Sequence, residues 1–90
     1  MLTITEEAAT LIRALRQDAA LREQAGLRMV VDPTNLSLSM DLVEAPAAGD
    51  TVVARYGARV FLSPSAAYRL GEGILQAQIT EQSSHFFLDR

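Results

Sequence analysis

Apolar residues recur along this chain with two different spacings, and the first of them predicts a helix near the amino terminus. One apolar stripe at helical spacing follows Thr5 and consists of Ala8, Leu11, Ile12, Leu15 and Ala19. Thr5 suits an N-cap, because its hydroxyl can accept a hydrogen bond from the N–H groups of the first turn. We therefore predict a helix that runs to about Ala20 or Glu23 and ends before Gly26.

Alternation of apolar and polar residues predicts strands over most of the remaining chain. The clearest alternation lies between Leu36 and Leu42, where every second residue is apolar and Ser37 and Ser39 lie on the opposite face. Pro33 ends the preceding strand, since proline has no N–H to donate to a sheet. The expected strands are residues 2–4, 27–31, 36–42, 51–54, 59–62, 74–80 and 86–88.

A second, shorter helix is expected after Ser63, with Ser63 as N-cap, Pro64 in the first turn and Gly71 as the stop. Strands outnumber helices, so we predict an α+β domain that is mostly β. It should contain antiparallel or mixed sheets of short strands, with the two helices packed on one side. The 90 residues make a single domain, 1–90, because the loop Glu44–Asp50 is too short to separate two.

Charge and composition exclude several classes of function. The net charge is −3, and the eight basic residues, all arginines, are scattered along the sequence, which argues against a nucleic-acid interface. No apolar run approaches the roughly 20 residues of a membrane span, and no signal peptide is visible, so we expect a cytoplasmic protein. The chain has no cysteine and hence no disulfide, so its stability requires good packing or a partner.

Several short motifs occur in an order and at spacings that characterise one known family. They are Ile4-Thr5-Glu6-Glu7-Ala8-Ala9, Gly26-Leu27-Arg28, Asp41-Leu42-Val43-Glu44-Ala45-Pro46, Gly49-Asp50, Gly57 with Val60-Phe61-Leu62 and Ser65, Tyr68-Arg69-Leu70-Gly71, and His85-Phe86. Together they resemble the A-type iron–sulfur carrier family, the HesB/IscA-like domain, over nearly the whole chain. The resemblance implies a HesB-like fold and descent from proteins of iron–sulfur cluster assembly.

The residues that hold the cluster in that family are missing here. The resemblance implies three cysteines, one in a Gly-Gly-Cys-Ser-Gly turn and two in a Cys-Gly-Cys tail. The corresponding turn is Asp32-Pro33-Thr34-Asn35-Leu36, and Asn35 occupies the first cysteine position, with Thr34 or Leu36 as alternatives. The given sequence stops at Arg90, where the tail would begin. Because cluster iron is held by thiolates and an amide is a neutral hard ligand, we expect no cluster and no other cofactor.

Two other kinds of site use the remaining polar residues. A non-thiolate metal or small-molecule site is the alternative function, and it would combine the turn that begins at Asp32 with His85, the only histidine. A lone histidine is more often structural than a ligand. Ser83 and Ser84 beside His85, with Asp89 nearby, suggest a hydrolase, but no Gly-x-Ser-x-Gly elbow accompanies them. We therefore expect that the protein is not an enzyme.

Two segments are candidates for contact with a partner. Ser37 and Ser39 form a polar row that is either a solvated face or an edge able to accept a partner strand. Phe86, Phe87 and Leu88 belong to the core, unless Phe87 is exposed and marks a partner surface. We predict an interaction or structural module that forms a homodimer or binds a protein partner of iron–sulfur biogenesis, without nucleic-acid or membrane partners.

Overall fold

The computed structural model describes residues 1–89, which contain two helices and seven strands. In chain order the elements are β1 (Thr3–Ile4), α1 (Glu6–Asp18), β2 (Gly26–Val31), β3 (Leu38–Val43), β4 (Thr51–Arg55), β5 (Ala58–Leu62), α2 (Pro64–Leu70), β6 (Ile74–Ile79) and β7 (Ser84–Asp89). The predicted α+β, mostly β class is confirmed. Neither helix within residues 1–89 has the length and hydropathy that crossing a lipid bilayer requires.

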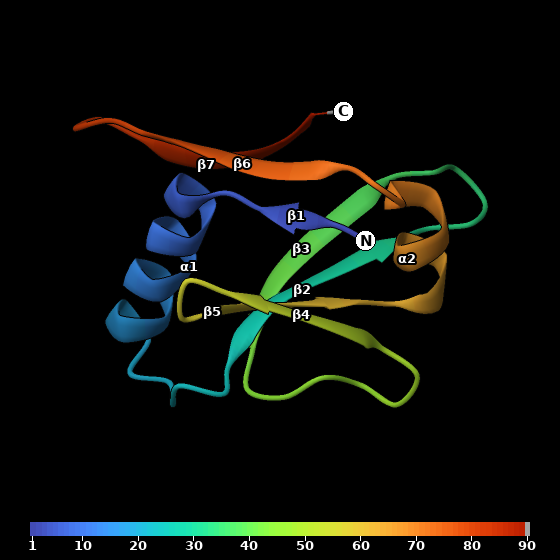
Figure 1. Cartoon of the computed structure of the whole chain (residues 1–90), viewed down its shortest axis with the longest axis horizontal. Coiled ribbons are helices and arrows are strands. Elements are labelled where there is room, and N and C mark those ends of the chain that lie inside the picture. The colour runs from blue at the N-terminus through green and yellow to red at the C-terminus, as the bar shows by residue number, and fades with distance from the viewer. Residues whose placement is uncertain (90) are drawn as a thin grey trace.

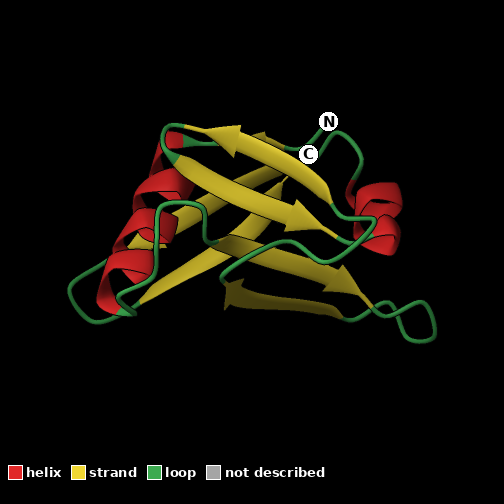
Figure 2. Cartoon of the chain, turned by 90° about the horizontal axis from the view of Figure 1, so that it is seen from below, coloured by secondary structure: helices red, strands yellow, loops and turns green. Residues whose placement is uncertain are grey.

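The strands form two sheets, and each sheet combines parallel with antiparallel pairing. The larger sheet has the order β3-β2-β5-β4, in which β2 and β5 are parallel and the outer strands run antiparallel to their neighbours. The smaller sheet has the order β1-β6-β7, with β1 parallel and β7 antiparallel to β6. In Figure 1 the smaller sheet lies above the larger one, and Figure 2 shows the strand layers from below. The mixed sheets of short strands agree with the prediction.

One hydrophobic cluster joins the two layers and both helices. Its buried members are Leu2, Ile4, Ala8, Ala9, Ile12, Leu27, Met29, Val31, Val53, Ala58, Val60, Leu62, Ala66 and Leu75. Alternate residues of a strand point to the same face, so the members from β2 and β5 define one face of the larger sheet. The members from α1 and α2 pack on that face, as predicted, and the helices occupy opposite ends of it in Figure 1.

The first helix begins where the sequence predicts but ends earlier. The hydroxyl of Thr5 accepts a hydrogen bond from the N–H of the third residue after it at 3.2 Å, which is the expected cap. The helix ends at Asp18, so the predicted extension to Ala20 or beyond is wrong. Ala20 takes a left-handed φ of 56°, and the N–H of Leu21 then donates to the carbonyl of Arg16 at 3.0 Å, which closes the helix end.

The other turn signals agree with the structure. Ser63 accepts a hydrogen bond from the N–H of Ala66 at 3.1 Å, and Gly71, with a φ of 47°, follows the end of α2. Between β4 and β5 the chain reverses at Tyr56 and Gly57, whose φ angles are 53° and 74°. Two successive left-handed residues make a tight hairpin turn.

The segment with the clearest alternation differs most from its prediction. β3 begins at Leu38, two residues later than expected, because Leu36 has a left-handed φ of 61° and belongs to the preceding turn. Its apolar face is only partly buried: Leu38 is 36% exposed, and Met40 and Leu42 are half-buried. β3 is an outermost strand, so one neighbour instead of two shields its side chains.

Candidate functional site

The turn between β2 and β3, residues 32–37, is where the resemblance places a cluster ligand. The N–H of Asp32 donates to the carbonyl of Ser37 at 2.9 Å, and the N–H of Leu36 donates to the carbonyl of Asp32 at 2.8 Å. Two side chains close the turn further. Oδ1 of Asp32 accepts from the N–H of Thr34 at 2.8 Å, and Oδ1 of Asn35 accepts from the N–H of Ser37 at 3.0 Å. Such side-chain-to-backbone bonds explain why aspartate and asparagine favour turns.

The side chains of Asp32 and Asn35 are exposed and accept hydrogen bonds from the backbone of the turn. Residues 32–39 are all exposed, so the turn does not enclose a cavity. Asn35 therefore presents a neutral amide whose oxygen already accepts an N–H, beside the 52% exposed apolar side chain of Leu36. The turn offers an ion one carboxylate, that of Asp32, and no thiolate. This donor set does not fit cluster iron.

His85, the other residue of the alternative metal site, lies far from this turn. It pairs with Gln78 across β6 and β7, next to the turn that joins these strands. In Figure 1 the β6–β7 turn lies at the left end of the molecule and the β2–β3 turn at the right end. The structure therefore does not bring Asp32 and His85 together. Residues 1–89 also contain no group of three or more His, Cys, Asp or Glu side chains placed to hold a metal ion.

The carboxyl-terminal hairpin also separates the residues that suggest a hydrolase. His85 and Asp89 lie four positions apart on one extended strand, which corresponds to about 13 Å. The carboxylate of Asp89 accepts a hydrogen bond from the amide of Gln76 at 3.1 Å. Ser83 belongs to the hairpin turn, where its N–H donates to the hydroxyl of Thr80 at 3.0 Å. The side chains thus do not converge as a nucleophile, base and acid must.

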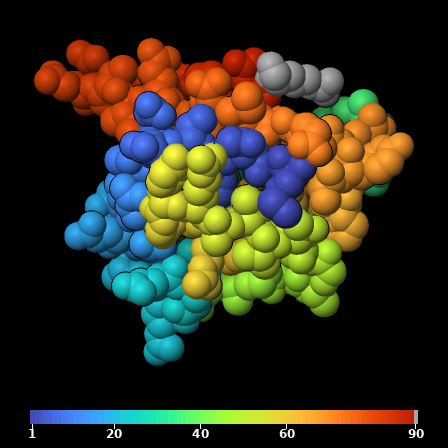
Figure 3. Space-filling view, in the orientation of Figure 1, coloured from blue at the N-terminus to red at the C-terminus, as the bar shows by residue number. Residues whose placement is uncertain are grey.

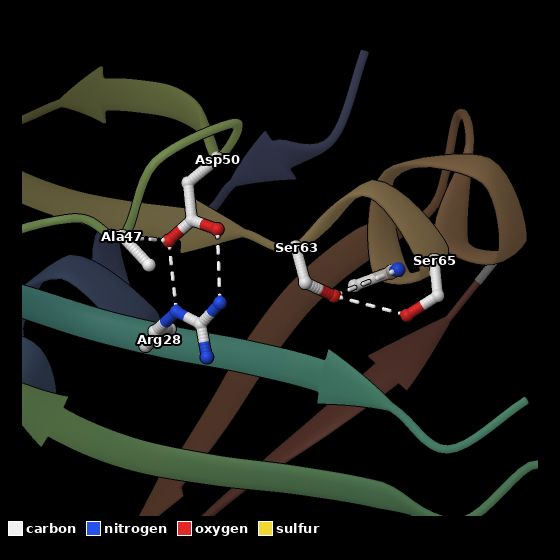
Figure 4. A network of polar contacts seen from close by, with 6 residues as sticks. Arg28, Ala47, Asp50, Ser63 and Ser65 are labelled. Atoms are coloured by element: carbon white, nitrogen blue, oxygen red, sulfur yellow. Dashed lines mark hydrogen bonds and ion pairs between the residues drawn. The ribbon is translucent and has the colours of Figure 1, made fainter.

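The loop between β3 and β4, residues 44–50, is fixed by an ion pair that spacing alone did not predict. Nε and Nη2 of Arg28 donate to the two carboxylate oxygens of Asp50 at 2.8 and 3.0 Å (Figure 4). The N–H of Ala47 donates to the same carboxylate at 2.9 Å, and the side chain of Asp50 is fully buried. The hydrogen bond from Arg28 outweighs burial and holds the pKa of Asp50 below its ordinary value of 3.8. The only signal in the sequence was that both residues lie in motifs of the resemblance.

A second group of polar contacts ties the start of α2 to the end of β2, directly before the 32–37 turn. The hydroxyl of Ser65 donates to the carbonyl of Val31 at 2.7 Å, and the N–H of Ser63 donates to the carbonyl of Met29 at 3.1 Å. The two serine hydroxyls lie 3.0 Å apart and point toward each other in Figure 4. These contacts fix the end of β2, from which the turn begins, whereas the contacts within the turn are local.

Apolar side chains remain exposed on the outermost strand β7 as well as on β3. β7 begins at Ser84, two residues before the predicted start, and its side chains alternate between the two faces. Phe86 and Leu88 pack against the hydrophobic core, which confirms the prediction for these two residues. Phe87 points to the other face, is 40% exposed and lies 6.1 Å from the ring of His85. It thus meets the condition under which the sequence predicts a partner surface.

Comparison with solved structures finds the same fold in three proteins, two of which are described in terms of iron–sulfur clusters. SufA of Escherichia coli, involved in the biosynthesis of iron–sulfur clusters, gives a TM-score of 0.80 at 24% identity, covering 98% of this chain and 83% of SufA. IscA with a [2Fe-2S] cluster gives 0.79 at 22% identity, covering 99% and 84% of the two chains. A protein from Aquifex aeolicus gives 0.78 at 20% identity, covering 99% and 90%. No protein-family model and no curated protein sequence matches the chain.

These similarities establish the class of fold. It is the A-type carrier or HesB-like fold that the resemblance predicts, and it extends over most of the length of each neighbour. Identities of 20–24% show a shared fold, and a fold does not by itself carry a ligand or an activity. In this chain the fold is present without a single cysteine.

Proposed function

We propose that this protein is a cluster-free interaction module with the fold of an A-type carrier, and that it forms a homodimer through strand β3. The observation that carries the proposal is the state of that strand. β3 is outermost in its sheet, pairs with β2 on one side and leaves Leu38, Met40 and Leu42 partly exposed. An edge strand with apolar side chains is a template for a further strand. In this proposal the protein is cytoplasmic and has no catalytic activity.

A second copy of the chain is the partner that β3 fits best. Two β3 strands related by a two-fold axis run antiparallel, so the same residues contribute from both sides, as in most homodimers. A domain of 90 residues without disulfides is marginal, and further burial of the β3 side chains would stabilise it. A partner from iron–sulfur biogenesis is the competing occupant, because SufA, with the same fold, is involved in that process.

Two observations support the absence of a cluster. The chain supplies no thiolate, and the carboxylate of Asp32 and the amide of Asn35 each accept a hydrogen bond from a backbone N–H of the turn. A second copy of the chain would contribute no thiolate either. Stoichiometric iron or a visible-region cluster spectrum after anaerobic reconstitution would contradict this part of the proposal.

Native mass spectrometry of three forms of the protein tests the interface. Leu38→Lys places a charge on β3, and Val52→Lys is the matched control, because Val52 is a 47% exposed residue on β4, the other outermost strand of the same sheet. We expect dimers for the parent and for Val52→Lys, and monomers with an unchanged circular dichroism spectrum for Leu38→Lys. Dimers that persist in Leu38→Lys, or that are lost equally in both variants, would contradict the β3 interface. The competing occupant would be identified if protein purified from its own host carried a bound iron–sulfur biogenesis protein. That partner should be lost in Leu38→Lys and retained in Val52→Lys.

A further inference from the structure

Half of the arginines gather at one end of the fold although they are scattered in the sequence. Arg13 and Arg16 come from α1, and Arg55 and Arg59 come from the β4–β5 hairpin. Together with Glu23 they line a cavity of about 330 Å³, which we call the arginine pocket. Figure 3 shows the hairpin lying against α1, and this contact assembles the group. The arginines are thus scattered along the chain, but four of the eight lie together at one end of the fold.

Two of the four guanidinium groups are oriented by backbone carbonyls at the rim of the pocket. Arg13 donates to the carbonyl of Tyr56 in the hairpin turn. Arg16 donates to the carbonyls of Gly57 and Glu23, both at 3.0 Å. These acceptors are neutral, so they fix the planar forks without cancelling their charge.

The charge of the arginine pocket is largely uncompensated. Residues 1–89 contain two ion pairs, Arg28 with Asp50 and the amino terminus with Glu72, and neither involves an arginine of the pocket. Glu23 is the one acid among the lining residues, which include four arginines. Each guanidinium has five N–H donors, and the contacts to carbonyls use only some of them. The pocket thus presents both charge and donors to a ligand.

We propose that the arginine pocket binds a compact, multivalent oxyanion of the phosphate class. Guanidinium forks match phosphate oxygens with pairs of parallel N–H donors. The volume of about 330 Å³ lies at the lower end of the range for small-molecule sites, roughly 300–1,000 Å³, which suits a diphosphate-sized group. A nucleic acid requires an extended basic surface, and the net charge of −3 does not provide one. The site uses no residue of the proposed β3 interface, so it stands independently of the homodimer.

Isothermal titration calorimetry of the full chain with inorganic pyrophosphate, at constant ionic strength, tests the site. Arg59 is exposed on β5, so Arg59→Gln removes one pocket charge without disturbing the core. Arg69→Gln is the matched control, because Arg69 is an exposed residue of α2 and the same charge is lost. We expect saturable binding at one site per chain, weakened about tenfold or more by Arg59→Gln, as for a lost charge-assisted hydrogen bond, and unchanged by Arg69→Gln.

Two further ligands separate the sources of the anion. If a nucleoside diphosphate binds more tightly than pyrophosphate, the bound oxyanion is part of a larger phosphate ester. If it binds equally or more weakly, the bound oxyanion is the inorganic anion. Either result supports the site. Absence of saturable binding, an equal loss in Arg69→Gln, or tighter binding of an oligoglutamate peptide than of pyrophosphate overturns the proposal.

Discussion

The two long connections of the larger sheet are held in opposite ways. The turn of residues 32–37, between β2 and β3, is closed by hydrogen bonds between its own members, and Asp32 takes part in three of them. The loop of residues 44–50, between β3 and β4, is held by Asp50, whose buried carboxylate binds Arg28, 22 positions earlier in the chain. The conformation of the first connection thus rests on contacts within the turn, and that of the second rests on a contact with strand β2 of the sheet.

This difference predicts that the fold tolerates substitutions in the 32–37 turn better than in the 44–50 loop. A substitution in a turn with local contacts changes that turn, because no core residue depends on its side chains. Asp50 instead links the 44–50 loop to β2, so its loss would reach the sheet. The resemblance follows the same division: Gly26-Leu27-Arg28 and Gly49-Asp50 match the family motifs, whereas Asp32–Leu36 departs from them.

The largest effect is expected from removing the Arg28–Asp50 ion pair, the clamp that holds the 44–50 loop. Asp50→Ala leaves the guanidinium of Arg28 without its carboxylate and the N–H of Ala47 without its acceptor. We expect the Tm measured by calorimetry to fall by roughly 10 °C in a domain of this size. Asp18→Ala is the control, since it removes an equal charge at the exposed end of α1, where a negative charge is slightly unfavourable. A Tm equal to that of the parent in Asp50→Ala would show that the loop does not depend on the clamp.

Acid should weaken the same clamp in a defined range of pH. The hydrogen bond from Arg28 lowers the pKa of folded Asp50 below the ordinary 3.8 expected in the unfolded chain. Its stabilisation is therefore complete above about pH 5 and is lost as the pH falls through the folded pKa. The difference in Tm between the parent and Asp50→Asn isolates this carboxylate from the others. We expect that difference to be constant from about pH 7 to about pH 5 and to shrink below about pH 4. If the difference in Tm already shrinks near neutral pH, a group other than Asp50 causes the pH dependence.

The sequence predicted local structure well and burial at the sheet edges poorly. Thr5 and Ser63 cap their helices as expected, because a cap requires only residues that lie within one turn. Alternation in β3 correctly placed Leu38 and Met40 on one face, but alternation cannot show whether a second layer covers that face. β3 is outermost, so its side chains stay partly exposed.

The candidate site was predictable only as far as its contacts are local. Asp32 and Asn35 lie in a turn, as their residue types and Pro33 indicate. The separation of His85 from that turn depends on strand order, which places the β6–β7 turn at the other end of the molecule (Figure 1). The Arg28–Asp50 pair and the arginine pocket also join distant segments, which residue spacing does not reveal.

The smallest change in Tm is expected in the turn of residues 32–37. Asp32→Ala removes the carboxylate oxygen that accepts a hydrogen bond from the N–H of Thr34. Because this N–H is exposed and can bond to water instead, the Tm should fall by only about 2–5 °C. Hydrogen exchange should become faster at Thr34 and stay unchanged along β2, since the contacts of the turn are local. In a thermal screen of divalent cations, the change in Tm on adding each cation should be the same for Asp32→Ala, for His85→Ala and for the parent. Faster exchange throughout β2, or a loss of Tm as large as in Asp50→Ala, would show that the turn is coupled to the sheet despite its local hydrogen bonds.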